Sequence, residues 1–374
     1  MKRLNISQVD ALFSNGAYPI EFLLFYENGV DTEAVRRAFR ELSAPFWPLF
    51  GQYDRGQIVF EGYREDACFD AEVRAEAFDA GKPNQLIHNR YRHEIPPAMK
   101  RLFFLKVIQH ENGTALVAKI NHVAGDGYSY FYFLSALAEL TRGALGAAHG
   151  QGAPSFPEPH HDRTVLREFA LGDLEPEPLG DTSGPTLAFL EVPRAAVQER
   201  IQHVADAKGQ RVSTNDVLAA LAIQRLATVG GGQAPDAFRL TVPIDVRREI
   251  REFGHQYFGN GLMYGRIPFR RSEVGSASLE EIAVAIRQGM PKVSTGSYTR
   301  YLEELELVIH ARQPSRLRPY DPAEDCLVTN LSRLPSDQLD FGSGTPSYVL
   351  PLTIGRNSAA VLGDRDQFVL RLEH

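Results

Sequence analysis

The chain has 374 residues, of which 43% are apolar and 23% are charged, the composition of a soluble globular protein with room for two domains. Forty Lys and Arg against 47 Asp and Glu leave a net charge of −7, and no basic stripe is interleaved with aromatic residues. We therefore expect no nucleic-acid partner.

The N-terminal residues and the cysteines predict a cytoplasmic protein. The opening stretch, MKRLNISQVDALFSNG, contains no apolar segment of signal-peptide length. The longest early apolar run, Ile20 to Tyr26, is interrupted by Glu21 and is too short to cross a membrane. The two cysteines, Cys68 and Cys326, are too few for a disulfide framework or a zinc site. We expect a reduced setting and no membrane contact.

The first third of the chain alternates the patterns of helices and strands. Apolar residues at every third or fourth position predict an amphipathic helix over 31–43, with Asp31 or Thr32 as the N-cap. A second, buried helix is expected over 128–140. Short β-branched and aromatic runs predict strands at 57–63, 101–109 and 115–120.

A change of composition divides the chain. Pro, Gly and acidic residues dominate from 146 to 185, which is typical of a crossover between domains. We expect an N-terminal domain over 1–145 and a C-terminal domain over 186–374, each a mixed β-sheet flanked by helices, in an α/β (α+β) fold. The second domain should contain strands near 187–192, 238–242, 261–268, 326–330, 347–354 and 367–372, and helices over 195–208, 213–230 and 278–288.

The stretch KINHVAGDGYSYFYF places His122 just past a predicted strand and Asp126 four residues later. A neutral imidazole with a pKa near 6.5 suits proton abstraction near neutral pH. Asp126 could orient that ring directly, or it could fix the loop from behind through an arginine, and the spacing does not choose. The alternative is a structural histidine beside an ordinary turn, which so short a motif favours when taken alone.

Three other features carry no chemistry in this interpretation. His160-His161-Asp162 lies in the Pro-rich crossover without further metal ligands and predicts a solvated linker. The run Gly230 to Gly232 predicts the end of a helix, because no Gly-Lys-Ser follows it to form a phosphate loop. The absence of a G-x-S-x-G segment argues against a serine hydrolase.

Eight short segments follow one another in the order of one known family. They are ISQVD (6–10), FWPLFGQ (46–52), HVAGDG (122–127), DVLAA (216–220), DVR (245–247), YFGN (257–260), VTNLSRLP (328–335) and DFGSG (340–344). The last two are the most specific, because Thr329 and Asp340 stand eleven residues apart, as in the family. The sequence therefore resembles the BAHD acyltransferases, a branch of the thioester-dependent HxxxD transferase superfamily that also contains chloramphenicol acetyltransferase and peptide-synthetase condensation domains.

Three positions refine this resemblance. Ser343 and Leu331 stand where the family has tryptophan, at positions that line or support its substrate region, so the acceptors of plant members are not carried over. Asn121 precedes His122, whereas condensation domains usually have a second histidine there, which favours a BAHD-type transferase. The chain resembles a microbial or otherwise diverged member.

The resemblance implies a two-domain, chloramphenicol acetyltransferase-like fold with a channel between the domains and His122 at its middle. His122 would be the general base, and Asp126 would turn away from the channel, pair with an arginine and support the loop. Thr329 is the candidate hydroxyl for the oxyanion, with a threonine that bonds to backbone as the alternative.

Further motif residues receive roles from the same resemblance. Gly127 would allow the backbone to pack closely. Asp340 and Gly342 would be architectural, with Asp340 paired to Arg247. The residues expected to bind substrate or cofactor are Gly127, Asn330, Ser332 and Ser343.

The implied reaction is transfer of an acyl group from a thioester to a hydroxyl or amine of a small-molecule acceptor. The expected donor is acyl-CoA as a co-substrate, and an acyl group on a carrier protein would be chemically equivalent. The mechanism requires no covalent acyl-enzyme, permanently bound cofactor or metal, and we expect a monomer. Two alternatives stay open: a non-catalytic member that binds a small molecule or a protein in the same cleft, and a stand-alone condensation-like enzyme that uses carrier-protein thioesters.

Overall fold

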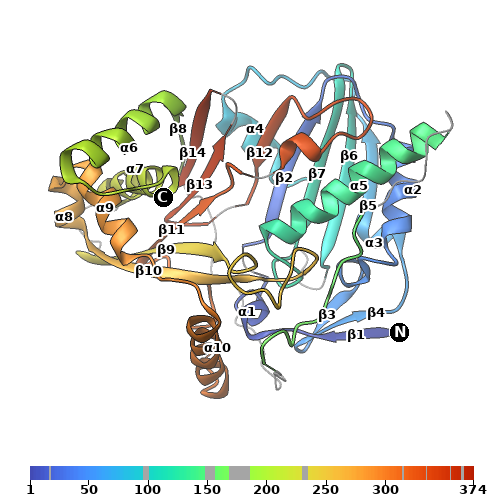
Figure 1. Cartoon of the computed structure of the whole chain (residues 1–374). Helices are drawn as coiled ribbons and strands as arrows, with labels where there is room; N and C mark the ends of the chain where they lie inside the picture. The colour runs from blue at the N-terminus through green and yellow to red at the C-terminus, as the bar shows by residue number, and fades with distance from the viewer. Residues whose placement is uncertain are drawn as a thin grey trace.

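The structure is a computed structural model that describes residues 1–16, 18–95, 101–147, 156–167, 186–229, 235–313, 316–333, 335–353, 355–363 and 366–374. These residues form two large β-sheets, each covered by its own group of helices, and one small sheet (Figure 1). The predicted α/β architecture is confirmed. Most of the predicted crossover over 146–185 and the run Gly230 to Gly232 lie outside the described residues.

The first large sheet leads to the histidine motif and is buried on both faces. Its strands, in spatial order, are β12 (Tyr348–Pro351), β2 (Ile20–Tyr26), β7 (Gly113–Ile120), β6 (Phe103–His110) and β5 (Phe69–Val73). Successive side chains of a strand point to opposite faces, so Leu24 enters the main core while Leu23 enters a second core behind it. Helices α2 (Thr32–Leu42) and α5 (Gly127–Ala147) cover the first face, and α4 (Asn84–Tyr91) covers the second.

The second large sheet carries its helices on one face. Its strands, in spatial order, are β10 (Leu262–Arg270), β9 (Ala237–Asp245), β11 (Asp325–Asn330), β13 (Ser358–Gly363), β14 (Gln367–Glu373) and β8 (Leu187–Pro193). The helices α6 (Arg194–Lys208), α7 (Thr214–Val229), α8 (Arg271–Ser276) and α9 (Leu279–Gly289) gather on its outer side (Figure 1). Alternate strand residues, such as Leu240 and Leu370, form a core with these helices.

The two large sheets are not built from separate halves of the chain. Strand β12 comes late in the sequence, yet it pairs antiparallel with β2 and places Leu350 opposite Leu23. The main core also includes Val246 and Phe258, which follow β9. A division at the crossover therefore describes the order of the chain and not two self-contained cores.

The remaining described elements are short, apart from one helix. The small sheet has the order β1 (Lys2–Asn5), β4 (Gln57–Phe60) and β3 (Gln52–Asp54). Short helices are α1 (Gln8–Ala11) and α3 (Glu65–Cys68), with 3₁₀ turns at Trp47–Phe50 and Ser336–Gln338. Helix α10 (Thr295–His310) lies below the edge strand β10 in the view of Figure 1 and contacts α1.

Most of the predicted elements are present. The helices expected over 31–43, 195–208 and 278–288 are confirmed as α2, α6 and α9. The helix α10 was missed, although its buried residues recur at a helical spacing. The run at Ile20 to Tyr26 was considered only as a targeting or membrane segment, whereas it is β2, a strand inside the first sheet.

Candidate active site

His122 lies in the loop between β7 and α5, where it is only partly buried. The loop is fixed at its start because the Asn121 N–H donates to the carbonyl of Leu102 at 2.8 Å. The imidazole stacks on the ring of Phe13, with ring centroids 3.7 Å apart and planes 11° from parallel. One face of the ring is therefore covered, and the ring cannot tilt freely.

The side chain of Asn260 determines which nitrogen of His122 carries the proton. Asn260 Nδ2 lies 2.7 Å from Asp10 Oδ1 and 2.8 Å from the His122 carbonyl, and both partners only accept. The amide is therefore oriented with Oδ1 toward His122 Nδ1, at 3.0 Å, and Nδ1 must donate to it. The lone pair of Nε2 is left as the basic position of the ring.

The environment favours the neutral form of His122. Burial lowers the pKa of His122, and this effect outweighs the opposite influence of Asp126, Asn260 and Asp10. A lowered pKa keeps the imidazole unprotonated near neutral pH, which is the form that a general base requires.

Asp126 points away from His122 and pairs with Arg247. Asp126 Oδ2 lies 2.8 Å from Arg247 Nη1, and Oδ1 lies 3.0 Å from Nη2. The same carboxylate accepts from the Ser129 N–H at 3.0 Å, which caps the first turn of α5, and from the Gly261 N–H at 2.9 Å. An arginine stands behind Asp126, and a direct triad contact with the histidine is absent.

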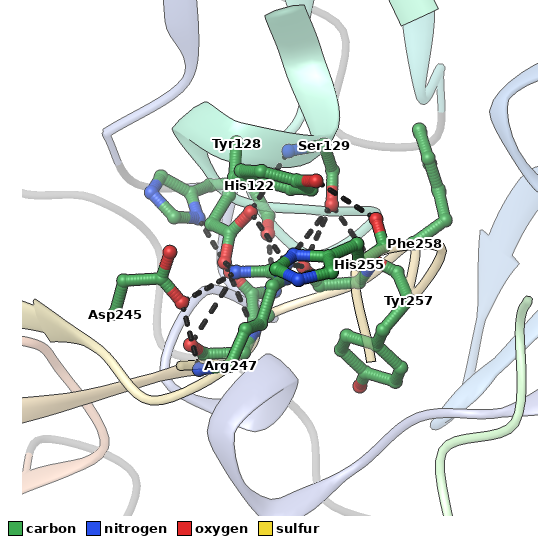
Figure 2. Close-up of polar contacts among 12 residues, drawn as sticks. His122, Tyr128, Ser129, Asp245, Arg247, His255, Tyr257 and Phe258 are labelled. Atoms are coloured by element: carbon green, nitrogen blue, oxygen red, sulfur yellow. Dashed lines mark hydrogen bonds and ion pairs between the residues drawn. The ribbon is translucent and has the colours of Figure 1, made fainter. Parts of the chain in front are cut away.

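Arg247 is the centre of this network (Figure 2). It lies beneath the start of α5 and contacts Asp126, Asp245 and the carbonyl of Gly259. Burial alone would raise the pKa of Asp126, but attraction to Arg247 outweighs burial and lowers it. The pair therefore stays ionised, and it joins the His122 loop to the loop after β9.

The glycine that the site requires is not the predicted one. A Cβ at Gly127 would meet nothing within 4 Å, so close backbone packing does not explain this glycine. At Gly261, in contrast, a Cβ would stand 2.7 Å from Arg247 Cζ, and at Gly259 it would overlap the guanidinium of Arg163. The close approach predicted at Gly127 occurs instead at Gly125, where a Cβ would stand 2.8 Å from Ser129 Cβ, and at Gly259 and Gly261.

The predicted residues of β11 fall on different sides of the second sheet. Val328 faces the helical core of that sheet, whereas Leu327 contacts the main core of the first sheet. Thr329 alternates with Val328 and so shares the face of Leu327, toward the main core of the first sheet. Asn330 is engaged elsewhere, because its Nδ2 donates to Asn215 of α7 at 3.0 Å and its Oδ1 accepts from Ser332 Oγ at 2.6 Å.

The DFGSG segment lies at the other end of β7 and not beside His122. The Ser343 carbonyl accepts from Asn28, which follows β2 at the end where Tyr26 pairs with Thr114. The expected pair of Asp340 with Arg247 is wrong. Asp340 Oδ1 accepts from the N–H groups of Gly342 and Gly344, at 2.8 and 2.9 Å. Ser343 therefore does not share a pocket with His122 in the described residues.

Part of the predicted crossover is packed against the site, although His160 and Asp162 are exposed, as expected of a solvated linker. His160 pairs with Tyr257 as an isolated bridge, and His161 Nε2 lies 2.7 Å from the Pro45 carbonyl. Arg163, two residues after His161, is buried. Sequence reasoning missed Arg163, Asp10 and Asn260; the last two lie in matched segments, whereas nothing in the crossover composition distinguishes Arg163.

Other site chemistries find little support in the described part of the chain. The two cysteines are free and buried, and burial raises the pKa of each thiol to about 12. Among the described residues, no group of three or more His, Cys, Asp or Glu side chains is arranged to hold a metal ion. None of the described helices is both long enough and apolar enough to span a membrane.

Known proteins resemble the chain in sequence over most of its length. The profile of the Transferase family matches residues 72–367. Hydroxycinnamoyl-CoA:5-hydroxyanthranilate N-hydroxycinnamoyltransferase HHT4 from Avena sativa is 24% identical over a region covering 87% of this chain and 78% of the relative. Alcohol acyltransferase 16 from Actinidia chinensis var. chinensis is 22% identical, covering 88% and 76%. The match to Acyl transferase 7 from Oryza sativa subsp. japonica, at 24% identity, covers 73% of this chain and 60% of that relative.

Solved structures agree with the fold. TRI101 of F. graminearum, crystallised with coenzyme A and deoxynivalenol, superimposes with a TM-score of 0.76 at 14% identity over 100% of this chain and 95% of that one. Vinorine synthase gives a TM-score of 0.71 at 16% identity, covering 100% and 90%. The two-domain, chloramphenicol acetyltransferase-like fold expected from the sequence is confirmed. With the profile covering most of the chain, the protein belongs to the Transferase family, the family of the BAHD-type acyltransferases.

Proposed function

We propose that the protein transfers an acyl group from acyl-CoA to a hydroxyl or amine of a small-molecule acceptor, with His122 as general base. The observation that carries this proposal is the hydrogen bond from His122 Nδ1 to Asn260 Oδ1, which leaves Nε2 as the proton acceptor of a neutral ring. A histidine that removes a proton needs a basic nitrogen of this kind.

The reaction follows from this tautomer. Nε2 of His122 takes the proton from the acceptor hydroxyl or amine as that group attacks the thioester carbonyl carbon. A tetrahedral intermediate forms, its C–S bond breaks, and the thiolate recovers the proton from the imidazolium. His122 is neutral again at the end of the cycle, and no acyl group is attached to the protein.

Asp126 takes no part in these proton transfers in the proposal. Its four acceptor contacts, including both arginine nitrogens, are used to hold the loop and the start of α5. Thr329 is the proposed donor to the oxyanion, since the alternation of β11 directs it away from the helical core and toward the first sheet.

The relatives support the choice of substrates. TRI101 was crystallised with coenzyme A and a small molecule, and the oat relative is named for a CoA thioester donor and an N-acyl product. Alcohol acyltransferase 16 from Actinidia chinensis var. chinensis is named for alcohol acceptors. A carrier-protein donor, and with it the condensation-like alternative, remains for the assay to test.

Release of free thiol from acyl-CoA, measured with panels of hydroxyl and amine acceptors, tests the proposal. His122→Ala should lower turnover by about 10²–10⁴-fold, the usual contribution of a general base. His255→Ala is the matched control, because this exposed histidine lies next to the network and contributes only its backbone carbonyl, to Tyr128. Full turnover by His122→Ala would refute the mechanism, and no thiol release by the wild type from any CoA or carrier-bound donor would favour a binding role.

A further inference from the structure

The segment 156–167 is part of the predicted crossover and lies against the loop that carries Asn260. The His160 N–H donates to the Gln256 carbonyl at 2.7 Å, and the Phe258 N–H donates to the His160 carbonyl at 2.8 Å. These two backbone bonds add the segment to the loop as a short strand would be added. The next buried side chain along the segment is that of Arg163.

The guanidinium of Arg163 contacts three separate parts of the structure. Nη2 donates to the Ala124 carbonyl at 2.8 Å, and Nη1 donates to the Phe258 carbonyl at 2.6 Å. Nε lies 3.3 Å from Asp10 Oδ2, as an ion pair without good hydrogen-bond geometry. Only 2% of the Arg163 side chain is exposed, so these contacts are not shared with bulk solvent.

Each of these three parts holds His122. Ala124 belongs to the His122 loop, and Phe258 precedes Asn260 by two residues. Asp10 accepts the Asn260 amide that fixes the tautomer. The forked geometry of arginine suits this task, because two carbonyls and a carboxylate lie in different directions around one planar group.

The loop is shaped around this guanidinium. A Cβ at Gly259 would overlap the Arg163 guanidinium, so glycine at this position leaves the space that the guanidinium occupies. The same charge lies beside Asp10, which is fully buried. A buried carboxylate without a cation nearby is costly, and Arg163 reduces that cost.

We propose that Arg163 is a positioning residue for His122, through which the crossover segment holds the base in place. The proposal rests on the proposed function, since it assumes that His122 is the base. It predicts that Arg163 acts on the rate of proton transfer and not on substrate binding.

Arg163→Met is the first test. Its kcat should fall about 10–100-fold, because an orienting contact is lost and the base is displaced, while KM for acyl-CoA changes little. The charges that act on the pKa of His122 are those of Asp126 and Asp10, which are paired with the buried cations Arg247 and Arg163. Loss of the Arg163 cation leaves the negative charge of Asp10 unbalanced, which should raise the pKa of His122. The decline of kcat/KM at low pH, called the acid limb below, should therefore move to higher pH.

Two further variants separate charge from shape. Arg163→Lys keeps the positive charge but cannot reach two carbonyls at once, so it should keep the wild-type acid limb and still lose kcat. Arg163→Met combined with Asp10→Asn removes both charges and avoids an unpaired buried carboxylate. The acid limb of this double variant should return toward that of the wild type, again with a reduced kcat.

Arg371→Met is the matched control for general destabilisation. Arg371 is also buried, pairs with Glu373 and donates to the Pro351 carbonyl at 2.7 Å, outside the His122 network. Its loss should lower stability and leave kcat and the acid limb unchanged. The proposal is wrong if the Arg163 variants keep the wild-type kcat and acid limb, or if they lose activity only in proportion to unfolded protein, as Arg371→Met would. Full turnover by His122→Ala would instead overturn the proposed function itself.

Discussion

The two ends of β7 differ in almost every physical respect. The strand has eight residues and spans roughly 26 Å at about 3.3 Å per residue. His122 follows one end, among buried charged groups that form ion pairs. The other end, at Gly113, opens into a polar cleft of about 600 Å³, lined by 27–31, 109–114 and 341–343.

This contrast separates two of the matched motifs, HVAGDG and DFGSG, by their positions in the fold. The HVAGDG segment lies at the end that holds His122, the proposed base, whereas DFGSG lies at the far end of the sheet. There Phe341 contacts Tyr26 edge-on, with ring centroids 5.6 Å apart, and the Tyr26 hydroxyl donates to the Leu339 carbonyl at 2.9 Å. The polar cleft lies where the sheet ends, whereas the proposed base lies at the end with the buried ion pairs.

The largest effect on stability is expected from replacing Arg247 by Met, and the matched exchange at the other end of β7 is Arg142→Met. Arg247→Met leaves Asp126 charged and buried without its partner, which should cost about 3–5 kcal/mol of unfolding free energy. Arg142→Met at the far end removes only a hydrogen bond from Nη1 to the Asp340 carbonyl, which should cost about 1.5–3 kcal/mol. Urea unfolding measures both.

The lowered pKa of Asp126 also predicts how the stability difference between wild type and Arg247→Met changes with pH. Because the folded pKa of Asp126 is lowered, the pair contributes stability above the unfolded value of about 3.9 and loses it as pH falls through the folded pKa. The gap between wild type and Arg247→Met should therefore narrow in acid. Equal costs for the two exchanges at neutral pH would contradict the contrast between the ends.

The next effect concerns the tautomer of the base. Asn260→Ala removes the acceptor of the His122 Nδ1–H, so kcat should fall about 10–100-fold. Asn112→Ala is the control at the other end, where Asn112 makes two hydrogen bonds with the Phe78 backbone. It should lower stability and leave kcat unchanged.

A pH profile of the wild type completes this test. Burial lowers the pKa of His122 below its ordinary value, and only the neutral base is active, so kcat/KM should stay level as pH falls through about 6.5 and decline only below it. A decline that begins above that pH would contradict a lowered pKa for His122. An Asn112→Ala variant as slow as Asn260→Ala would refute the proposed role of Asn260.

Local patterns predicted much of the fold and less of its assembly. The apolar spacing of α2 and the run of β7 are visible in short windows, because each element buries one periodic face. The pairing of β12 with β2 is not visible, since Leu350 and Leu23 are 327 residues apart in the sequence and meet only in the folded sheet. Tertiary pairing of this kind leaves no local periodicity.

The same distinction applies to the site. His122, Asp126 and Arg247 could be named because each stands in a recognisable segment, but the partner of Arg247 was misassigned to Asp340. Arg163 could not be named, because its role arises from contacts with Ala124 and the loop before Asn260 across long stretches of chain. A Pro-rich composition indicates a crossover, but it does not predict that the side chain of Arg163 is buried against the loop before Asn260.

The smallest effect on the reaction is expected at the far end. Asp340→Ala removes two hydrogen bonds to the N–H groups of Gly342 and Gly344, and it should lower the unfolding free energy by about 1–2 kcal/mol. Because this turn lies the length of β7 away from His122, kcat should stay within about twofold of wild type, well short of the tenfold that 1.4 kcal/mol on the barrier would bring. A loss of tenfold or more in a well-folded Asp340→Ala protein would mean that the far cleft takes part in binding donor or acceptor, and Ser343 would then regain the substrate role that the resemblance implied.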